Sequence, residues 1–373
     1  MVTKASSSMN DRLIITGLGA VSPLGLSARD QTIVANGWIF DDIDAAARVK
    51  VQEYRHTVLS IPETFSIKDY VTPVALRRKQ RFSQIAMAAA VDAFADSGLA
   101  DRPANLERVG LVASTEYGPQ RAVGKYLDGL IGGGLFEASP GLFTQTVYNV
   151  ANGQASLALG LKGANSTIVG GSSVAYAALL IATRKADAIF ALSVDETNEI
   201  MTSYFDAADF GPGDLAFTFR TGEAAAVVVL ESQSSALARG ATELAELLGW
   251  SSASAPGLGV SYADWAEDDT TIAHAMLGAL RDADLAISNI DLVVGTANGL
   301  GVLSRSEFSA IRGLGYTGPV LYPRLMTGEC FGGNEALAYI LGLNHAAPGS
   351  TMLITVSTAN GGVTSTVVRK AAS

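Results

Sequence analysis

The chain has 373 residues, of which 48% are hydrophobic and 17% are charged, and 39 of them are glycine. This length suits two ordinary domains or one large duplicated domain with extensive buried layers. The formal net charge of −10 argues against a nucleic-acid partner, which usually requires a basic surface. A single cysteine, Cys330, excludes an internal disulfide and fits a reducing cytoplasm.

Neither a membrane segment nor a metal site is predicted. Residues 1–10 are polar and serine-rich, and we expect a disordered tail there rather than a signal peptide. No apolar run is long enough to span a bilayer, so we expect a cytoplasmic protein without a membrane partner. The three histidines (His56, His274 and His345) lack the spacing of metal ligands, so no metal is expected.

The first apolar segment, 13–16, predicts a strand that ends in the glycine-rich sequence 17–25. A glycine-rich turn after a strand is typical of dinucleotide sites. Here, however, the third glycine is missing and Pro23 prevents a following helix, so we expect no nucleotide cofactor. In the next segment, 80–98, apolar residues recur at helical spacing up to Gly98, which predicts an amphipathic helix.

The following segments alternate between apolar strands and alanine-rich helices. In chain order we predict a strand at 109–113, helices at 118–130 and 147–159, a strand at 188–194, an irregular loop at 205–219, a strand at 224–230, a helix at 232–240, a strand at 244–248, helices at 270–280 and 336–345, and a strand at 352–356. Because these strands are continuous apolar runs, we expect them to be buried on both faces between layers of helices.

Two stretches of the chain recur in weak form. The segment 292–301 resembles 109–118, and the helix and strand at 336–356 resemble those at 177–194. Such similarity predicts an internal duplication of α/β units. The expected units are a disordered tail at 1–10, an N-terminal half at 11–240 and a C-terminal half at 241–373.

The segment 163–174 is the centre around which the other elements are expected to assemble. It reads as an apolar strand, the turn Gly170-Gly171, and a helix that opens in small residues, which resembles a nucleophile elbow. At such a turn, free N–H groups and the positive end of the helix dipole stabilise an anion.

Motifs along nearly the whole chain, in the right order, resemble those of the β-ketoacyl-carrier-protein synthases. They are the opening sequence 13–25, the segment 81–98, Asn149 with Asn152-Gly153-Gln154, the segment 222–225, the segment 326–328 and Gly361-Gly362. The resemblance implies the thiolase fold. In this α/β fold two similar halves form a five-layered α-β-α-β-α sandwich, normally as a dimer.

In that family a cysteine nucleophile occupies the elbow, but this chain has none there. Counting from Gly163 places the nucleophile position at Ser172, whereas counting back from Asp187 places it at Thr167. The two counts differ because residues around the elbow are deleted, so both positions stay candidates. A serine or threonine hydroxyl without an adjacent base is a poor nucleophile.

The other catalytic positions of the family have changed as well. The two histidines that act on the malonyl extender fall at Asn298 and Glu329, the lysine falls at Arg324, and the gating phenylalanine falls at Asn360. Asparagine does not titrate. A Glu329 carboxylate would repel a malonyl group and its enolate unless burial raised its pKa. The resemblance therefore implies a ketosynthase-like chain with no catalytic residues.

Such a chain resembles the chain-length factor, the β subunit of type II polyketide synthases. That family pairs with a catalytic ketosynthase in a heterodimer, meets the acyl carrier protein through the complex, and shapes the acyl tunnel. The equivalent tunnel positions here are Thr115, Tyr117, Gly118 and Ala122. If a helix begins at Thr115, then Thr115, Gly118 and Ala122 share one face. Such small side chains suit a long, reduced product such as a polyene, and they equally suit helix packing alone.

Two functions from different classes therefore stay open. The first is a non-catalytic subunit that determines chain length in a heterodimer with a ketosynthase. The alternative is an autonomous thiolase-fold acyltransferase or decarboxylase that acts through Ser172 or another non-cysteine group. The alternative needs a base beside Ser172, and the sequence reveals none.

Overall fold

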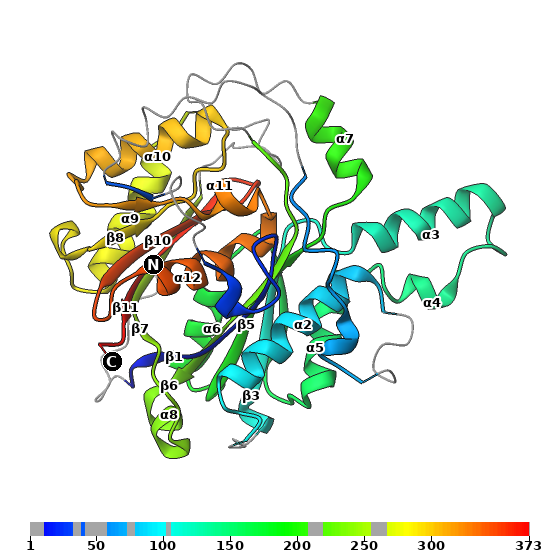
Figure 1. Cartoon of the computed structure of the whole chain (residues 1–373), viewed down its shortest axis with the longest axis horizontal. Helices are drawn as coiled ribbons and strands as arrows, with labels where there is room; N and C mark the ends of the chain where they lie inside the picture. The colour runs from blue at the N-terminus through cyan, green and yellow to red at the C-terminus, as the bar shows by residue number, and fades with distance from the viewer. Residues whose placement is uncertain are drawn as a thin grey trace.

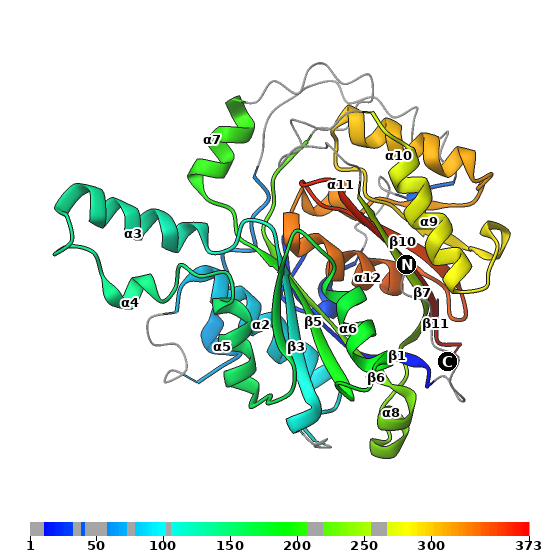
Figure 2. The same ribbon diagram turned by 180° about the vertical axis from the view of Figure 1, so that it is seen from behind.

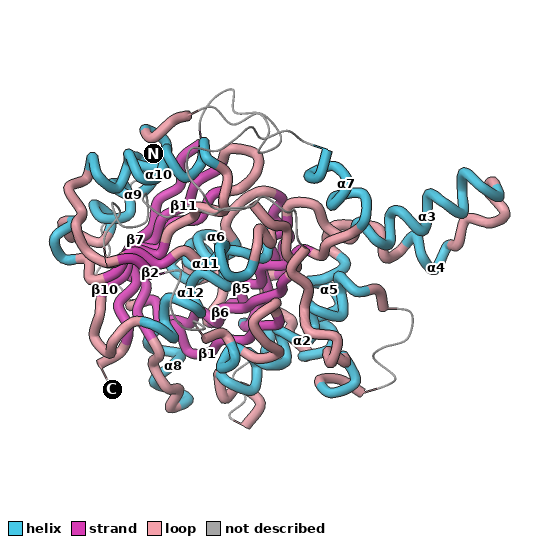
Figure 3. The backbone as a smooth tube through the Cα atoms, turned by 45° about the horizontal axis from the view of Figure 1, so that its top comes forward, coloured by secondary structure: helices cyan, strands magenta, loops and turns pink. Residues whose placement is uncertain are grey.

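A computed structural model of the chain describes residues 11–32, 39–41, 58–72, 79–101, 106–207, 219–254 and 267–372. The predicted tail at 1–10 and residues 208–218 of the predicted loop lie outside these ranges. Within the described part, the strands form one mixed sheet in the order β2-β9-β8-β10-β11-β7-β1-β6-β5-β3-β4. Figure 3 shows this sheet running through the molecule with helices packed around it.

The elements have the following bounds. The strands are β1 (Leu13–Val21), β2 (Ile39–Phe40), β3 (Val109–Thr115), β4 (Asn165–Val169), β5 (Ala188–Asp195), β6 (Ala224–Ser232), β7 (Ala245–Ser254), β8 (Leu292–Val294), β9 (Val320–Leu321), β10 (Thr351–Ser357) and β11 (Gly362–Lys370). The α-helices are α2 (Arg81–Asp96), α3 (Gln120–Gly133), α4 (Pro140–Phe143), α5 (Val150–Leu159), α6 (Ser173–Ala182), α7 (Glu199–Ala207), α8 (Gln233–Arg239), α9 (Thr270–Asp282), α10 (Gly301–Gly313), α11 (Pro323–Thr327) and α12 (Asn334–His345).

The strand order repeats between the two halves of the sheet. In the first half, β4, β3 and β5 are parallel neighbours, and β6 and β1 follow in antiparallel pairing. In the second half, β9, β8 and β10 are parallel, and β11 and β7 follow in the same way. An antiparallel contact between β1 and β7 joins the halves. The structure thus confirms the duplication, with β3 equivalent to β8 and β5 equivalent to β10.

Five layers arise because each half of the sheet is covered on both faces. The helices α2 and α5 pack on the outer face of the first half, and α9 and α10 pack on that of the second. Between the halves lie α6 and α12 (Figures 1 and 2). Along β6, Val227 faces the outer layer and Val228 faces the central one, and both are fully buried. The continuous apolar strands therefore have the two-sided burial that the sequence predicted.

The predicted glycine-rich turn at 17–25 is wrong in its first part, because β1 continues to Val21. Gly17 and Gly19 lie against α2. A Cβ at these positions would come within 2.6 Å of the Ser97 Cβ and 2.2 Å of the Ala89 carbonyl oxygen. The glycines thus allow a helix to pack closely on the strand, and they do not mark its end.

Other predicted boundaries, chiefly the first residues of two helices, also differ from the structure. The helix predicted from residue 118 begins at Gln120, because Gly118 has a φ of +70° and Pro119 is the residue before the first turn. The helix predicted from residue 147 begins at Val150. The start of the predicted loop at 205–219 belongs to α7. The structure also contains α10 and β11, for which no element was predicted.

One part of the molecule stands away from the layers. The helices α3 and α4 project from the body as an arm, which we define as residues 120–143 (Figure 1). The base of the arm follows directly from the end of β3, beside the elbow strand β4. No helix in the described ranges is long and apolar enough to cross a membrane.

Candidate functional site

The elbow connects β4 to α6. Gly170, with a φ of +65°, turns the chain after the strand, and Ser172 is the N-cap of α6. The Ser172 hydroxyl accepts the N–H of Ala175 at 2.9 Å, as capping serines do. Thr167 instead lies in the middle of β4, opposite Ala113 of β3. Of the two candidates from the sequence, Ser172 is the residue at the elbow.

Glu335, in the first turn of α12, lies against this elbow, and the sequence analysis did not identify it. The Ser172 hydroxyl donates to its carboxylate, which also accepts the hydroxyl (2.9 Å) and N–H (2.8 Å) of Ser173. Burial raises the pKa of the Glu335 carboxyl. A carboxylate that accepts this many hydrogen bonds serves mainly to satisfy the donor groups at the N-terminus of α6.

Asn298 and Glu329, which the sequence analysis assigned to the two histidine positions, lie in a separate, buried network. Asn298 donates its amide to Glu329 at 2.7 Å, and Arg324 donates to the same carboxylate oxygen at 2.9 Å. The other Glu329 oxygen accepts the N–H of Phe331 (2.9 Å) and the amide of Asn334. The residues at the positions of the histidines and the lysine are thus all brought together by the structure.

The polar side chains of this network are engaged with one another and with the backbone. The amide of Asn298 is bonded to Glu329, and its carbonyl oxygen accepts the N–H of Leu300. The Arg324 guanidinium donates to the Ser357 carbonyl as well as to Glu329. The Glu329 carboxylate is thus compensated inside the protein by the Arg324 guanidinium and by the amide of Asn298.

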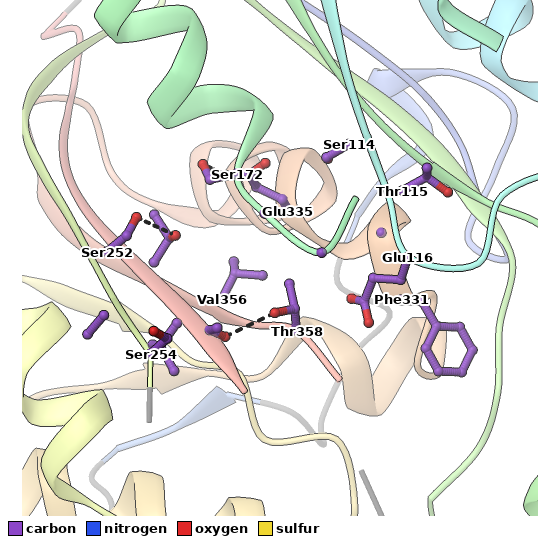
Figure 4. A pocket seen from close by; sticks show the side chains of 17 residues that line it. Ser114, Thr115, Glu116, Ser172, Ser252, Ser254, Phe331, Glu335, Val356 and Thr358 are labelled. Atoms are coloured by element: carbon purple, nitrogen blue, oxygen red, sulfur yellow. Dashed lines mark hydrogen bonds between the residues drawn. The ribbon is translucent and has the colours of Figure 1, made fainter. Parts of the chain in front are cut away.

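A cavity of about 230 Å³ opens beside the elbow (Figure 4). Its walls come from the end of β3, the elbow, the end of β7, the strands β10 and β11, and the short helix η7 (Phe331–Gly333). Ser172 and Thr115 are the predicted site residues that line it. Asn298, Glu329 and Arg324 do not belong to its lining.

Glu116 is a further carboxyl group in the cavity wall. One of its oxygens accepts the N–H of Ala359 at 2.8 Å, and the other is buried with no hydrogen-bond partner among the described residues. Burial, together with the neighbouring charges of Glu329 and Asp195, raises the pKa of Glu116 well above its ordinary value. Its carboxyl therefore keeps a proton to higher pH than an exposed glutamate does.

The predicted tunnel residues do not share a helical face. Thr115 ends β3, and its hydroxyl donates to Asp195 at 2.6 Å. Gly118 lies in the turn before α3, and the ring of Tyr117 meets that of Phe331 edge-on at a centroid distance of 4.8 Å. Ala122 is fully buried in the first turn of α3. The sequence argument placed these residues on one face only if a helix began at Thr115, and this condition is not met, because α3 begins at Gln120.

Asp195 and Glu335 are the residues that sequence reasoning missed. Both are acidic residues at the boundary of an apolar element, Asp195 at the end of β5 and Glu335 at the start of α12. A charged residue at such a position, next to continuous apolar runs, is the signal that would have identified them.

Comparison with known proteins gives a consistent result. The profile described as "Beta-ketoacyl synthase, N-terminal domain" matches residues 10–236. The chain is 28% identical to the 3-oxoacyl-[acyl-carrier-protein] synthase 2 of Coxiella burnetii over 356 residues, covering 88% of the chain and 84% of that protein. It is also 28% identical to the Staphylococcus aureus (strain COL) protein of the same name over 268 residues, 65% of the chain. The chain spans 63% of the length of that relative.

Solved structures share the fold over almost the entire chain. The ishigamide ketosynthase/chain length factor superposes with a TM-score of 0.79 and 19% identity, covering 97% of the chain and 100% of the other. A β-ketoacyl synthase from Burkholderia phymatum gives 0.71 and 23%, covering 96% and 99%. A ketosynthase in complex with its chain length factor from Xenorhabdus doucetiae gives 0.69 and 14%, covering 99% and 100%.

Proposed function

Since the chain belongs to the β-ketoacyl synthase family, we propose that it is a non-catalytic subunit that pairs with a cysteine-containing ketosynthase and shapes the acyl tunnel. In this role it acts as the chain-length factor of a type II polyketide synthase. The observation that carries the proposal is the buried network of Asn298, Arg324 and Glu329. The sequence motifs assign these three residues to the catalytic positions of the family.

Condensation requires a nucleophile that carries the acyl chain and groups that stabilise the enolate of the extender. A serine hydroxyl is hardly ionised at neutral pH, and here it caps a helix. The anionic partner of Arg324 opposes the negative charge of an enolate rather than stabilising it. At the positions that the motifs assign to catalysis, neither half of the reaction therefore has its chemical group.

A large apolar surface supports a protein partner. The arm exposes Ile131 (82%), Leu135 (82%) and Phe136 (103%). In the described sheet β4 is the last strand, with an exposed Val169. The helix α5, which contacts β4 and lies on the side of the molecule from which the arm projects (Figures 1 and 2), exposes Leu157. Exposed apolar surface beside an unpaired strand edge is typical of an obligate interface. The proposed occupant is the ketosynthase, through which the acyl carrier protein reaches the complex.

A second candidate function is an autonomous acyltransferase or decarboxylase that acts through Ser172. The hydrogen bond between Ser172 and Glu335 favours it, because it supplies the base that the sequence did not reveal. The same carboxylate, however, also accepts bonds from the Ser173 hydroxyl and backbone N–H. Its lone pairs are thus shared with groups that stay in place during any reaction, which makes it a poor base.

The first prediction separates the two candidates. The isolated chain should show no condensation of acyl and malonyl carrier proteins, and adding a cysteine-containing ketosynthase partner should give turnover that exceeds that of the ketosynthase alone. Product formation is followed by mass spectrometry of the carrier proteins.

Turnover by the isolated chain that Ser172→Ala abolishes would contradict the proposal and support the second candidate. The matched control is Ser232→Ala, because Ser232 caps α8 in the same way as Ser172 caps α6. Each variant loses a helix cap at a cost of about 1 kcal/mol, and Ser172→Ala also loses the hydrogen bond to Glu335. Unfolding of both variants is therefore measured, and a loss of activity confined to a folded Ser172→Ala protein reports on chemistry rather than stability. The reduced, polyene-like product expected from the sequence stays a prediction for the same assay.

A further inference from the structure

Asp195 lies at the end of β5, directly behind the wall of the cavity, and its side chain is fully buried. Its carboxylate accepts hydrogen bonds from the turn between β3 and α3, namely from the Thr115 hydroxyl (2.6 Å) and the N–H groups of Glu116 (2.7 Å), Tyr117 (3.2 Å) and Gly118 (2.8 Å). It also accepts the N–H of Gly332 in η7 at 2.8 Å. One side chain thus holds together two segments that are distant in the sequence.

These two segments touch through their backbones. A Cβ on Gly332 would lie 2.4 Å from the Cα of Thr115 and 2.8 Å from the backbone nitrogen of Glu116, so only glycine allows this approach. The adjacent Phe331 has a φ of +49°, which is unfavourable for a residue with a side chain. Surrounding contacts must hold such a conformation in place, and the bond from Gly332 to Asp195 is one of them.

Each segment serves a different part of the molecule. The turn leads directly into α3, the first helix of the arm. Glu196, which follows Asp195 in the sequence, accepts the N–H of Arg121 in the first turn of α3 at 2.9 Å. The other segment, η7, follows the buried network of Glu329. Both segments also line the cavity, through Thr115, Glu116, Phe331 and Gly332. The turn that leads into the arm and the cavity wall therefore meet at Asp195.

We propose that Asp195 is a positioning residue that couples the arm to the cavity wall, so that a partner bound on the arm fixes the cavity shape and the product length. The part about product length rests on the proposed function, whereas the coupling does not. A carboxylate is required because it offers two acceptor oxygens and no donor. Asparagine would keep one acceptor but would turn an NH₂ group toward N–H donors.

Hydrogen exchange of the full-length chain tests the coupling. In Asp195→Asn, the amides of Glu116, Gly118 and Gly332 should exchange together, about tenfold faster or more, because charge-assisted hydrogen bonds are lost on both sides. The matched control is Asp187→Asn, the same change at the residue directly before the first residue of β5. The Asp187 side chain forms an exposed ion pair with Arg108 at 2.8 Å. This variant should leave these amides unchanged.

Acceleration in the turn without acceleration at Gly332 would overturn the coupling. If Asp195→Asn does not fold, Thr115→Val removes the hydroxyl bond to Asp195 together with the bond that the hydroxyl accepts from the Gly118 N–H (3.0 Å). Gly118 is then affected directly, so acceleration at Gly332, to a smaller degree than expected for Asp195→Asn, is the informative result. An effect of Thr115→Val on the turn alone overturns the coupling equally.

Product analysis of the complex with the ketosynthase tests the second part. The Asp195→Asn complex should assemble with an unchanged Kd and release a broader distribution of chain lengths, with an unchanged KM for the extender. A product distribution identical to that of wild type would overturn the link to product length. A wild-type chain that neither binds the ketosynthase nor alters its products would contradict the proposed function instead. The coupling between the two segments would then be tested by hydrogen exchange alone.

Discussion

Arg324 and Glu329 are two opposite charges in the protein interior, only 2.9 Å apart, with 3% and 0% of their side chains exposed. Removing two such charges from water costs several kcal/mol for each ion, and their attraction offsets this only with good geometry and further hydrogen bonds. Here Asn298 and the N–H of Phe331 supply such bonds to the carboxylate. The pair is therefore stable as a unit, although either member alone would be costly.

Removing one member should be more harmful than removing both. Glu329→Gln and Arg324→Met should each lower the free energy of unfolding by about 3–5 kcal/mol, because the other charge stays buried. The double variant should lose less than either single variant, and therefore less than the sum of the two. Urea unfolding of the four proteins measures this coupling.

The surface pair Arg108–Asp187, with side chains 42% and 39% exposed, is the control, and its loss should cost no more than about 1 kcal/mol. Strictly additive effects of Glu329→Gln and Arg324→Met would contradict the interpretation of the buried pair.

Glu196 predicts a pH dependence of stability. Burial raises the pKa of its carboxyl from the ordinary 4.5 to about 7. Between these values the folded state keeps a proton that the unfolded state has lost, so this group stabilises the fold at low pH and the contribution is lost as pH rises toward 7. Glutamine does not titrate and can still accept the Arg121 N–H.

Glu196→Gln should therefore gain stability over wild type between pH 4.5 and 7, by roughly 1–3 kcal/mol, and the difference should then level off. Denaturant midpoints across this range provide the measurement. Parallel pH profiles for the two proteins would show that Glu196 is not protonated in the folded chain at pH 5–6.

At the scale of elements, α3 is the segment on which chain-length control depends in our proposal. Ala122 is fully buried at its start, so Ala122→Phe adds bulk to a packed wall at a cost of about 1–3 kcal/mol. If this wall faces the acyl tunnel of the complex, the added ring shortens the product. Mass spectrometry of products bound to the carrier protein compares the variant and wild-type complexes.

Ala236→Phe is the matched control for this variant, since Ala236 is buried in α8. It should lower stability by a similar amount and leave product length unchanged. An intact, active Ala122→Phe complex with wild-type products would remove α3 from the tunnel.

The duplicated fold was predictable because apolar runs determine which segments are buried. The similarity of 292–301 to 109–118 and of 336–356 to 177–194 indicated the repeat. The start of α3 was not predictable from spacing alone, since small residues at 115, 118 and 122 fit a helix. The actual start depends on the positive φ of Gly118 and on Asp195, which binds the N–H groups of the turn. Such tertiary bonds override local periodicity.

At the scale of the whole molecule, the site was only partly predictable for a similar reason. The order of the motifs predicted that Asn298, Glu329 and Arg324 occupy the positions of the family's two histidines and its lysine. The structure brings these three residues together. The contact between Ser172 and Glu335 joins residues 163 positions apart, and nothing in the local sequence of either one indicates the other. Long-range contacts between polar residues follow from the packing of α12 against α6, which only the assembled layers determine.

Assembly with a partner should depend on the arm. Ile131→Ser and Phe136→Ser should each weaken binding of the ketosynthase about tenfold or more, because buried apolar anchors dominate interface energy. Both side chains are exposed in the isolated chain, so its own stability should not fall. Leu237→Ser, an exposed leucine (71%) on α8, is the control. Equal binding by all three variants would place the interface elsewhere.

The exposed ring of Phe136 also has a consequence for the cell that makes this protein. In the proposed heterodimer, a copy without its partner would display the kind of apolar surface that chaperones retain and proteases degrade. Surplus chains should therefore be removed until the two subunits are present in equal amounts. Pulse-chase labelling should show a short half-life for the chain expressed alone and a longer one for Phe136→Ser, so that the surface used for assembly also controls subunit dosage.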